Sequence, residues 1–234
     1  MGVIQNGGEP VTTQHLLVRY AKRGKMRFAS HLDVARAFER GVRRADLPVA
    51  YSTGFTPHPK ISYAGGAPTG VASEAEYLSL TLTSRTEADD ARQRLNAALP
   101  DGIDVITVTE DSGGLPASRL TASEWQVALP GLPADNVVPV VKKFLALTEA
   151  PVERLTSKGL RRMDARAAVV SLDVLDDPGA GCALRMVVRH TVPSVRPDDV
   201  LNALRDVSDV FPAGQPLMTR LAQGSLGESG VVKL

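Results

Sequence analysis

The order of predicted strands and helices is the feature that most constrains this fold. The first half of the chain reads as strand, helix, two strands, helix, strand. Alternation of apolar and polar residues predicts the strands, and helical spacing of apolar residues predicts the helices. The predicted strands are 15–20, 60–64, 76–83 and 102–109, with a short extended piece at 49–51, and the predicted helices are 31–45 and 87–99.

The same order recurs after a Gly- and Ser-containing stretch, 111–121, which reads as a linker. The strands of this second half are predicted at 124–129, 166–175, 183–190 and 217–223, and its helices at 134–147 and 196–207. Two successive β-α-β-β-α-β units predict an α+β protein made of two tandem ferredoxin-like halves with antiparallel sheets. The expected divisions are a disordered tail 1–13, a first half 14–110, the linker 111–121, a second half 122–224 and a loose tail 225–234.

The predicted helix 31–45 is amphipathic. Ser30 is a suitable N-cap, and Asp33 three residues later resembles the acid of a capping box. Glu39 and Arg43 have the i,i+4 spacing of an ion pair. The expected apolar stripe is Leu32, Ala35, Phe38, Val42 and Ala45. Four arginines fall roughly opposite that stripe: Arg36, Arg40, Arg43 and Arg44.

Positive charge is concentrated around this helix. From Arg19 to Lys60 there are ten basic side chains against three acidic ones, a net charge of +7, although the whole chain carries only +1. Such a segment attracts polyanions, of which phosphate backbones are the commonest. A solvated helix surface of no further function is the competing interpretation.

A proline-rich loop follows the helix. Gly54 permits unusual backbone geometry, and His58 stands between two prolines, which favour extended backbone. A stiff loop that presents Phe55 and His58 loses little entropy when it binds a ligand. An ordinary turn between a helix and a strand is equally consistent with these residues.

A second basic patch lies in the second half and is interpreted as a loop that enters a strand. It contains two acidic residues, Glu153 and Asp164, and five basic ones: Arg154, Lys158, Arg161, Arg162 and Arg166. It is either part of a phosphate-binding surface or an ordinary solvated loop.

The first third of the chain resembles the radical SAM-linked protein family, a bacterial domain of unknown function. The resemblance is carried by R-Y-A-K-x-G-x-x-x-F-x-S-H-L-D from Arg19, R-R-A-x-L-P from Arg43 and S-x-G-F-x-P-H-P-x-I-S-x-A from Ser52, together with Gly70, Ser73 and Glu74. It implies a radical SAM protein as partner, either fused to this domain or encoded beside it. It implies no established activity.

The chain has a single cysteine, Cys182, so it cannot ligate an iron–sulfur cluster by itself. No cofactor and no metal site are predicted. The sequence contains no apolar run of membrane-spanning length and no recognisable signal peptide, which predicts a cytoplasmic protein without membrane association.

Three functions from different classes are consistent with the sequence. The first is a non-catalytic accessory module that binds tRNA or rRNA and works with a radical SAM partner in RNA modification. The second is a protein-interaction subunit that docks on that partner. The third is an RNA-processing enzyme that uses His31, Asp33 and His58, if these meet in space. The candidate RNA-binding residues are Arg19, Lys22, Arg23, Lys25, Arg27, Arg36, Arg40, Arg43, Arg44, Phe55, His58, Lys60, Lys158, Arg161 and Arg162.

Overall fold

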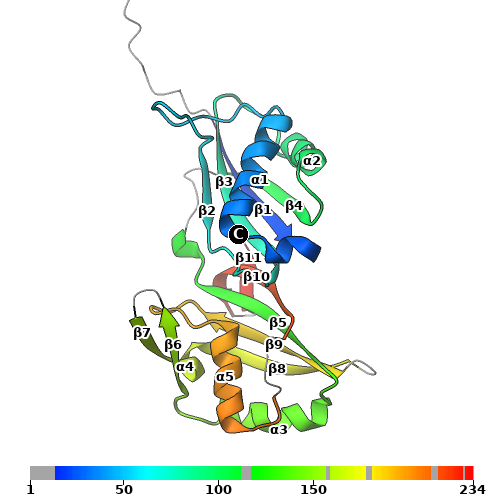
Figure 1. The fold of residues 1–234 in the computed structure, drawn as a ribbon, viewed down its shortest axis with the longest axis vertical. Coiled ribbons are helices and arrows are strands. Elements are labelled where there is room, and N and C mark those ends of the chain that lie inside the picture. Colours follow the sequence, from blue (N-terminus) through cyan, green and yellow to red (C-terminus); the bar gives the residue numbers. More distant parts are fainter. Residues whose placement is uncertain are drawn as a thin grey trace, which may run out of the picture. The chain divides into compact units, whose positions relative to one another are not determined.

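The computed structural model describes residues 14–111, 117–156, 159–177, 181–211, 216–228 and 230–233. The chain forms two compact units, the first ending at Ala117 and the second beginning at Ser118 (Figure 1). Both combine helices with antiparallel strands, so the α+β prediction is confirmed. The expected tail 1–13 lies outside the described residues. No helix among the described residues is long and apolar enough to cross a membrane.

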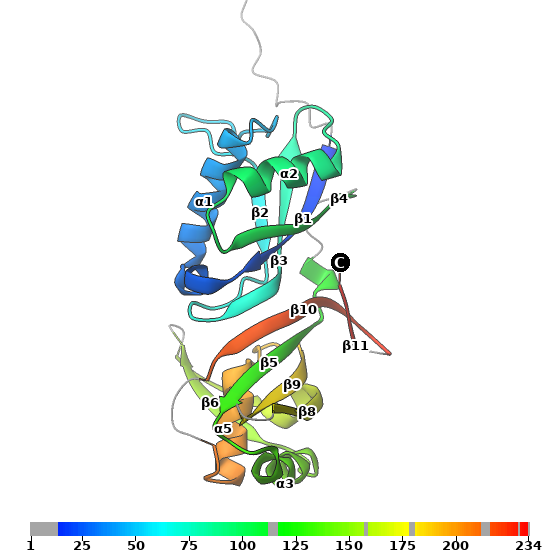
Figure 2. The same cartoon turned by 90° about the vertical axis from the view of Figure 1, so that its right-hand side faces the viewer.

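The first unit is a four-stranded antiparallel sheet in the order β4-β1-β3-β2. Two helices cover one face of this sheet (Figure 2). The elements, in chain order, are β1 (Gln14–Lys22), the 3-10 helix η1 (Gly24–Phe28), α1 (His31–Arg44), β2 (Ile61–Ala64), β3 (Ala72–Leu82), α2 (Ala88–Ala98) and β4 (Ile103–Asp111).

Alternation along the strands places the core of the first unit between the sheet and its helices. On β3, Leu78, Leu80 and Leu82 are fully buried in this core. Helix α1 contributes Phe38, whose ring packs edge-on against Tyr20 with 4.7 Å between ring centroids. Helix α2 begins after Glu87, and the backbone of Thr86 bonds to the Gln14 side chain.

The second unit has a four-stranded antiparallel sheet in the order β10-β5-β9-β8, with β11 paired to β10. A separate two-stranded hairpin, β6-β7, stands beside α5. The elements are the 3-10 helix η2 (Ala117–Arg119), β5 (Ala122–Pro130), α3 (Ala134–Leu145), β6 (Pro151–Thr156), β7 (Gly159–Asp164), α4 (Ala165–Ala168), β8 (Val169–Asp177), β9 (Gly181–Arg189), α5 (Pro197–Val207), β10 (Met218–Gly227) and β11 (Gly230–Lys233).

Three sequence predictions in the second unit are wrong. The segment expected as a basic loop is the β6-β7 hairpin, and the strand expected to begin at Arg166 is preceded by the short helix α4. The stretch expected as a loose tail from 225 contributes the end of β10 and the strand β11. Helix α3 has Pro133 as its N-cap and Asp135 in its first turn.

Candidate nucleic-acid interface

Helix α1 carries the strongest candidate site, and its N-terminal end is capped by side chains. The Asp33 backbone N–H donates to Ser30 Oγ at 3.2 Å, and the Asp33 carboxylate accepts from the Ser30 backbone N–H at 3.1 Å. This reciprocal arrangement is the capping box that the sequence predicts.

The buried face of α1 differs from the predicted stripe. Val34, Ala37, Phe38, Gly41 and Val42 are buried, whereas Leu32 is 65% exposed and Ala35 only half-buried. The small residues explain the difference, because they mark the closest approach of α1 to its neighbours. A Cβ built on Gly41 would lie 2.8 Å from Leu99 Cδ2.

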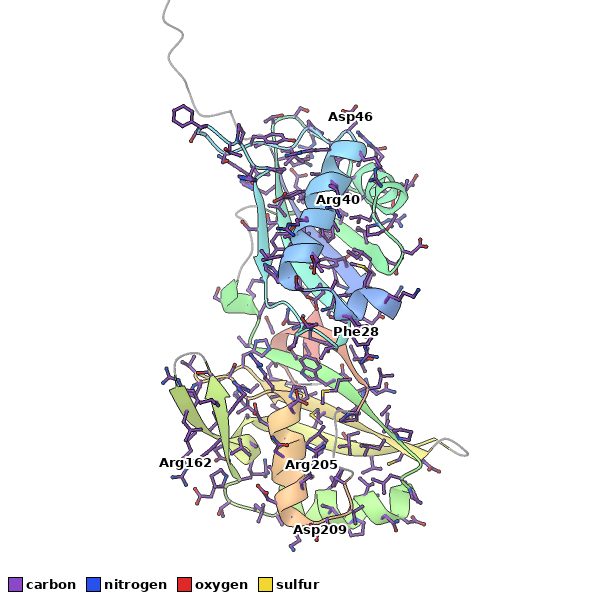
Figure 3. The ribbon with its side chains drawn as sticks, in the orientation of Figure 1. Phe28, Arg40, Asp46, Arg162, Arg205 and Asp209 are labelled. Carbon is purple, nitrogen blue, oxygen red and sulfur yellow. The ribbon has the colours of Figure 1, made fainter. Side chains whose placement is uncertain are left out.

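Arg36, Arg40, Arg43 and Arg44 are all exposed, as the sequence predicts. Figure 3 labels Arg40 on α1. We call Arg36, Arg40 and Arg43 the arginine row. Within the described residues none of the three lies within ion-pair distance of a carboxylate. Arg44 differs, because its Nη1 donates to the Ala98 carbonyl at 2.8 Å.

The expected Glu39–Arg43 ion pair is absent from the described residues. Glu39 instead influences Tyr63, whose pKa is raised chiefly by burial and secondarily by this carboxylate. Arg43 lies over the ring of Tyr51, 6.0 Å from the ring centroid. Among the described residues, the arginine row therefore forms no ion pair with a carboxylate of α1.

Several predicted RNA-binding cations serve the fold instead. Lys22 is 3% exposed, and its Nζ donates to the carbonyls of Ala67 and Pro68 at 3.2 and 3.3 Å. Arg23 forms ion pairs with Glu74 and, at 3.0 Å, with Asp104.

Arg27 also bonds within the fold. Its Nε donates to the Gly70 carbonyl at 2.7 Å, and its guanidinium lies 5.3 Å from the Phe28 ring centroid. Three of the ten cations between Arg19 and Lys60 are therefore bonded within the fold: Lys22, Arg23 and Arg27.

The remaining candidates of the first unit are dispersed. Arg19 is half-buried on β1 and projects from the face opposite Val18 and Tyr20, so it points away from the helices. Lys25 is exposed on η1, and Lys60 is half-buried just before β2. None of these three extends the arginine row.

The loop after α1 is closed at its base. Tyr51 and Pro59 form a β-bridge, the Ser52 N–H donates to the His58 carbonyl at 2.8 Å, and the His58 N–H donates to Ser52 Oγ at 3.0 Å. We call residues 52–58 the Phe55 loop, because the Phe55 side chain at its tip is fully exposed. Contact of Arg43 with Tyr51 joins the base of this loop to the C-terminal end of α1.

The three candidate catalytic residues are not brought together. His31 begins α1 and stacks edge-on against Tyr63, 5.2 Å between ring centroids, whereas His58 lies beside Tyr51 at the other end of the helix. Fourteen residues of helix separate these ends by roughly 20 Å. No group of three or more His, Cys, Asp or Glu side chains arranged to hold a metal occurs among the described residues.

Asp33 provides a test of the capping geometry. Hydrogen bonds from Ser30, with a smaller effect of Arg36, lower the pKa of Asp33. Its contribution to stability is therefore present above the unfolded-state pKa and is lost as the pH falls through the lower, folded-state value.

We expect Ser30→Ala to raise the Asp33 pKa toward the ordinary value, because the strongest of these hydrogen bonds is removed. Carboxyl-carbon NMR titration of wild type and variant measures this shift directly. An unchanged Asp33 pKa in Ser30→Ala would show that the capping box does not control this carboxylate.

The second basic patch is smaller than the sequence suggests. Lys158 lies outside the described residues. Arg154 forms an ion pair with the buried carboxylate of Asp199, and Arg166 donates to the Leu145 carbonyl at 3.1 Å. Arg161 and Arg162 on β7 are exposed, and neither forms an ion pair with a described residue (Figure 3).

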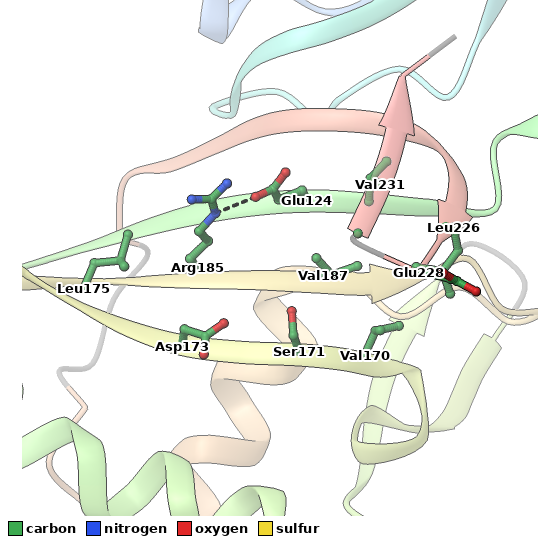
Figure 4. A pocket seen from close by; sticks show the side chains of 12 residues that line it. Glu124, Val170, Ser171, Asp173, Leu175, Arg185, Val187, Leu226, Glu228 and Val231 are labelled. Atoms are coloured by element: carbon green, nitrogen blue, oxygen red, sulfur yellow. Dashed lines mark hydrogen bonds and ion pairs between the residues drawn. The ribbon is translucent and has the colours of Figure 1, made fainter.

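An open groove of about 660 Å³ lies on the sheet of the second unit, and no sequence pattern predicted it. Its charged lining is Glu124, Asp173, Glu228 and Arg185, with Arg185 directed at Glu124 across β5 and β9 (Figure 4). The acidic excess repels phosphate, so this groove is a poor nucleic-acid site.

Comparison with known proteins gives a family but no activity. The family model described as "Uncharacterized protein conserved in bacteria (DUF2344)" matches residues 15–197, which include parts of both units. No curated protein matches the chain.

Two solved structures resemble the chain weakly. A crystal structure of a Cbf5-Nop10-Gar1 complex is 12% identical with a TM-score of 0.48, covering 94% of this chain and 52% of that one. An unknown protein from Galdieria sulphuraria is 15% identical with a TM-score of 0.24, covering 84% of this chain and 92% of that one. The chain thus spans about half the length of the first structure's chain. Neither likeness is strong enough to support a functional argument.

Proposed function

We propose that this chain, which belongs to the family described as uncharacterized proteins conserved in bacteria, is a non-catalytic accessory protein that binds RNA. The observation that carries the proposal is the arginine row on α1. Three exposed guanidinium groups on one helix face have no ion-pair partner among the described residues. Guanidinium groups bind phosphate through paired hydrogen bonds, and several in a row suit the phosphodiester backbone of RNA.

The finer architecture that we propose is two ferredoxin-like halves. Strand orders β4-β1-β3-β2 and β10-β5-β9-β8 support it, because the strands occupy equivalent places in the two orders once the inserted β6-β7 hairpin is set aside. This fold serves many functions, so the functional proposal depends on the arginine row and not on the fold.

We further propose a radical SAM protein as the partner and tRNA or rRNA modification as the process. Support comes from the sequence motifs between Arg19 and Glu74. The single cysteine, Cys182, is consistent with a division of labour in which the partner holds the cluster. The accessory protein then supplies RNA affinity that the catalytic partner lacks.

Binding of the purified full-length chain to total tRNA and rRNA across a salt series tests the RNA proposal. Affinity should fall as the salt concentration rises, because bound arginines release counterions from the phosphates. Absence of binding to either RNA at low salt would remove the proposal.

A second candidate, docking on a protein partner, is favoured by one observation. Phe28 ends the 3-10 helix η1, and Leu32 is in the first turn of α1. Each of these side chains is 65% exposed. Exposed aromatic and aliphatic groups next to arginines are typical of protein interfaces. Co-purification with the radical SAM protein after nuclease treatment separates the candidates: a complex that survives nuclease and is lost in Phe28→Ala/Leu32→Ala supports docking.

A further inference from the structure

We infer that the RNA bound at this site is single-stranded, and that one of its bases stacks on Phe55; this inference rests on the proposed RNA-binding function. Phe55 is the most exposed aromatic residue among the described residues. Moving the exposed surface of an aromatic ring out of water and against another flat apolar surface is favourable. A nucleobase provides such a surface.

The Phe55 loop is built to hold its tip in place before any ligand arrives. The Tyr51–Pro59 bridge and the two hydrogen bonds between Ser52 and His58 close its base. Pro57 and Pro59 restrict the backbone between them. A ring presented on a closed loop loses less conformational entropy on stacking than one on an open loop.

The arginine row leads to this loop. Arg36 and Arg43 are seven residues apart on α1, which corresponds to about 10 Å along the helix axis. Arg43 already contacts Tyr51, and Phe55 lies four residues farther, at most about 14 Å away in an extended chain. Phosphates can therefore follow the arginines while bases reach Tyr51 and then Phe55.

A duplex does not fit these features as well as a single strand. Bases inside a duplex are stacked on both faces and cannot pack against a protruding ring. Unpaired bases expose their faces, and proteins that bind single strands combine a cationic track with aromatic platforms. Arginines alone would accept either form, so Phe55 is the residue that decides between them.

The test uses the full chain and a short RNA with 2-aminopurine in place of one base, as a single strand and as a blunt duplex. We expect tighter binding of the single strand, and quenching of 2-aminopurine fluorescence as it stacks. Phe55→Ala should weaken single-strand binding by about 5- to 100-fold and abolish the quenching, while Phe55→Trp should retain both.

Val192→Ala is the control, because the Val192 side chain is also fully exposed but belongs to the second unit. It should leave affinity and quenching unchanged. Equal binding of duplex and single strand, or wild-type behaviour of Phe55→Ala, would overturn the inference while leaving RNA binding intact. Failure of both RNAs to bind would instead remove the proposed function on which it rests.

Discussion

Replacing Arg36 and Arg40 together by glutamine is expected to weaken RNA binding by at least about 10-fold at low salt, since a hydrogen bond to a charged group contributes roughly 1.5–3 kcal/mol. Both side chains are exposed and neither has an ion-pair partner among the described residues, so the fold should be unaffected. The slope of log affinity against log salt should become less negative by about 1.4 for a single-stranded RNA, because two phosphate contacts are lost.

Arg85→Gln/Arg92→Gln is the matched control for net charge. Arg85 pairs with Glu110 at 3.0 Å and Arg92 with Asp89 at 2.8 Å, so both guanidinium groups are already engaged in the same unit. This double variant removes as much positive charge as the first, yet its affinity and salt slope should stay near those of wild type. Equal losses in the two double variants would show that total charge matters and the arginine row does not.

Phe38→Ala is expected to destabilise the protein by about 3–5 kcal/mol, the usual cost of removing a buried phenylalanine. The Phe38 ring is fully buried between α1 and the sheet, 4.7 Å from the Tyr20 centroid and 6.4 Å from that of Tyr63. Because no small side chain can fill that space, a cavity remains and α1 loses its main anchor. Denaturant unfolding measures the loss as a lower midpoint.

Leu32→Ala is the control for this second prediction. The sequence places Leu32 on the same apolar stripe as Phe38, but its side chain is 65% exposed. Its replacement should change the free energy of unfolding by less than about 0.5 kcal/mol. A large loss in Leu32→Ala, or a small one in Phe38→Ala, would contradict the orientation that we describe for α1.

The sequence predicted the helix α1 and its start because both depend on neighbouring residues. Ser30 and Asp33 are three positions apart, and the capping box forms as expected. The phase of the buried face was predicted less well. Ala37 and Gly41 pack closely because of what faces them, including Leu99, and a pattern of large apolar residues does not reveal such small-residue contacts.

The sequence pattern also did not show which cations are bonded within the fold. Lys22 and Arg23 bond to groups at 67, 68, 74 and 104, which lie far along the chain. A local count of charge predicts a basic region but cannot tell which cations will find such distant partners. The arginine row was predictable because helical spacing alone sets those residues on the exposed side.

One signal in the second unit was overlooked. Asp164 caps the short helix α4, its carboxylate accepting from the backbone N–H groups of Arg166 at 2.9 Å and Ala167 at 3.3 Å. An Asp followed by Ala-Arg-Ala-Ala is a local helix signal that could have been used. The β6-β7 hairpin was harder to predict, because its register depends on pairing of β6 with a β7 strand whose polar side chains are mostly exposed.

Ultraviolet cross-linking of the protein to RNA in cells, with the cross-linked peptides identified by mass spectrometry, tests the central claim most directly. We predict cross-linked nucleotides on peptides between Arg36 and Pro59, which carry the arginine row and the Phe55 loop. Cross-links confined to other parts of the chain, or none above the background of an Arg36→Gln/Arg40→Gln/Phe55→Ala variant, would contradict the account.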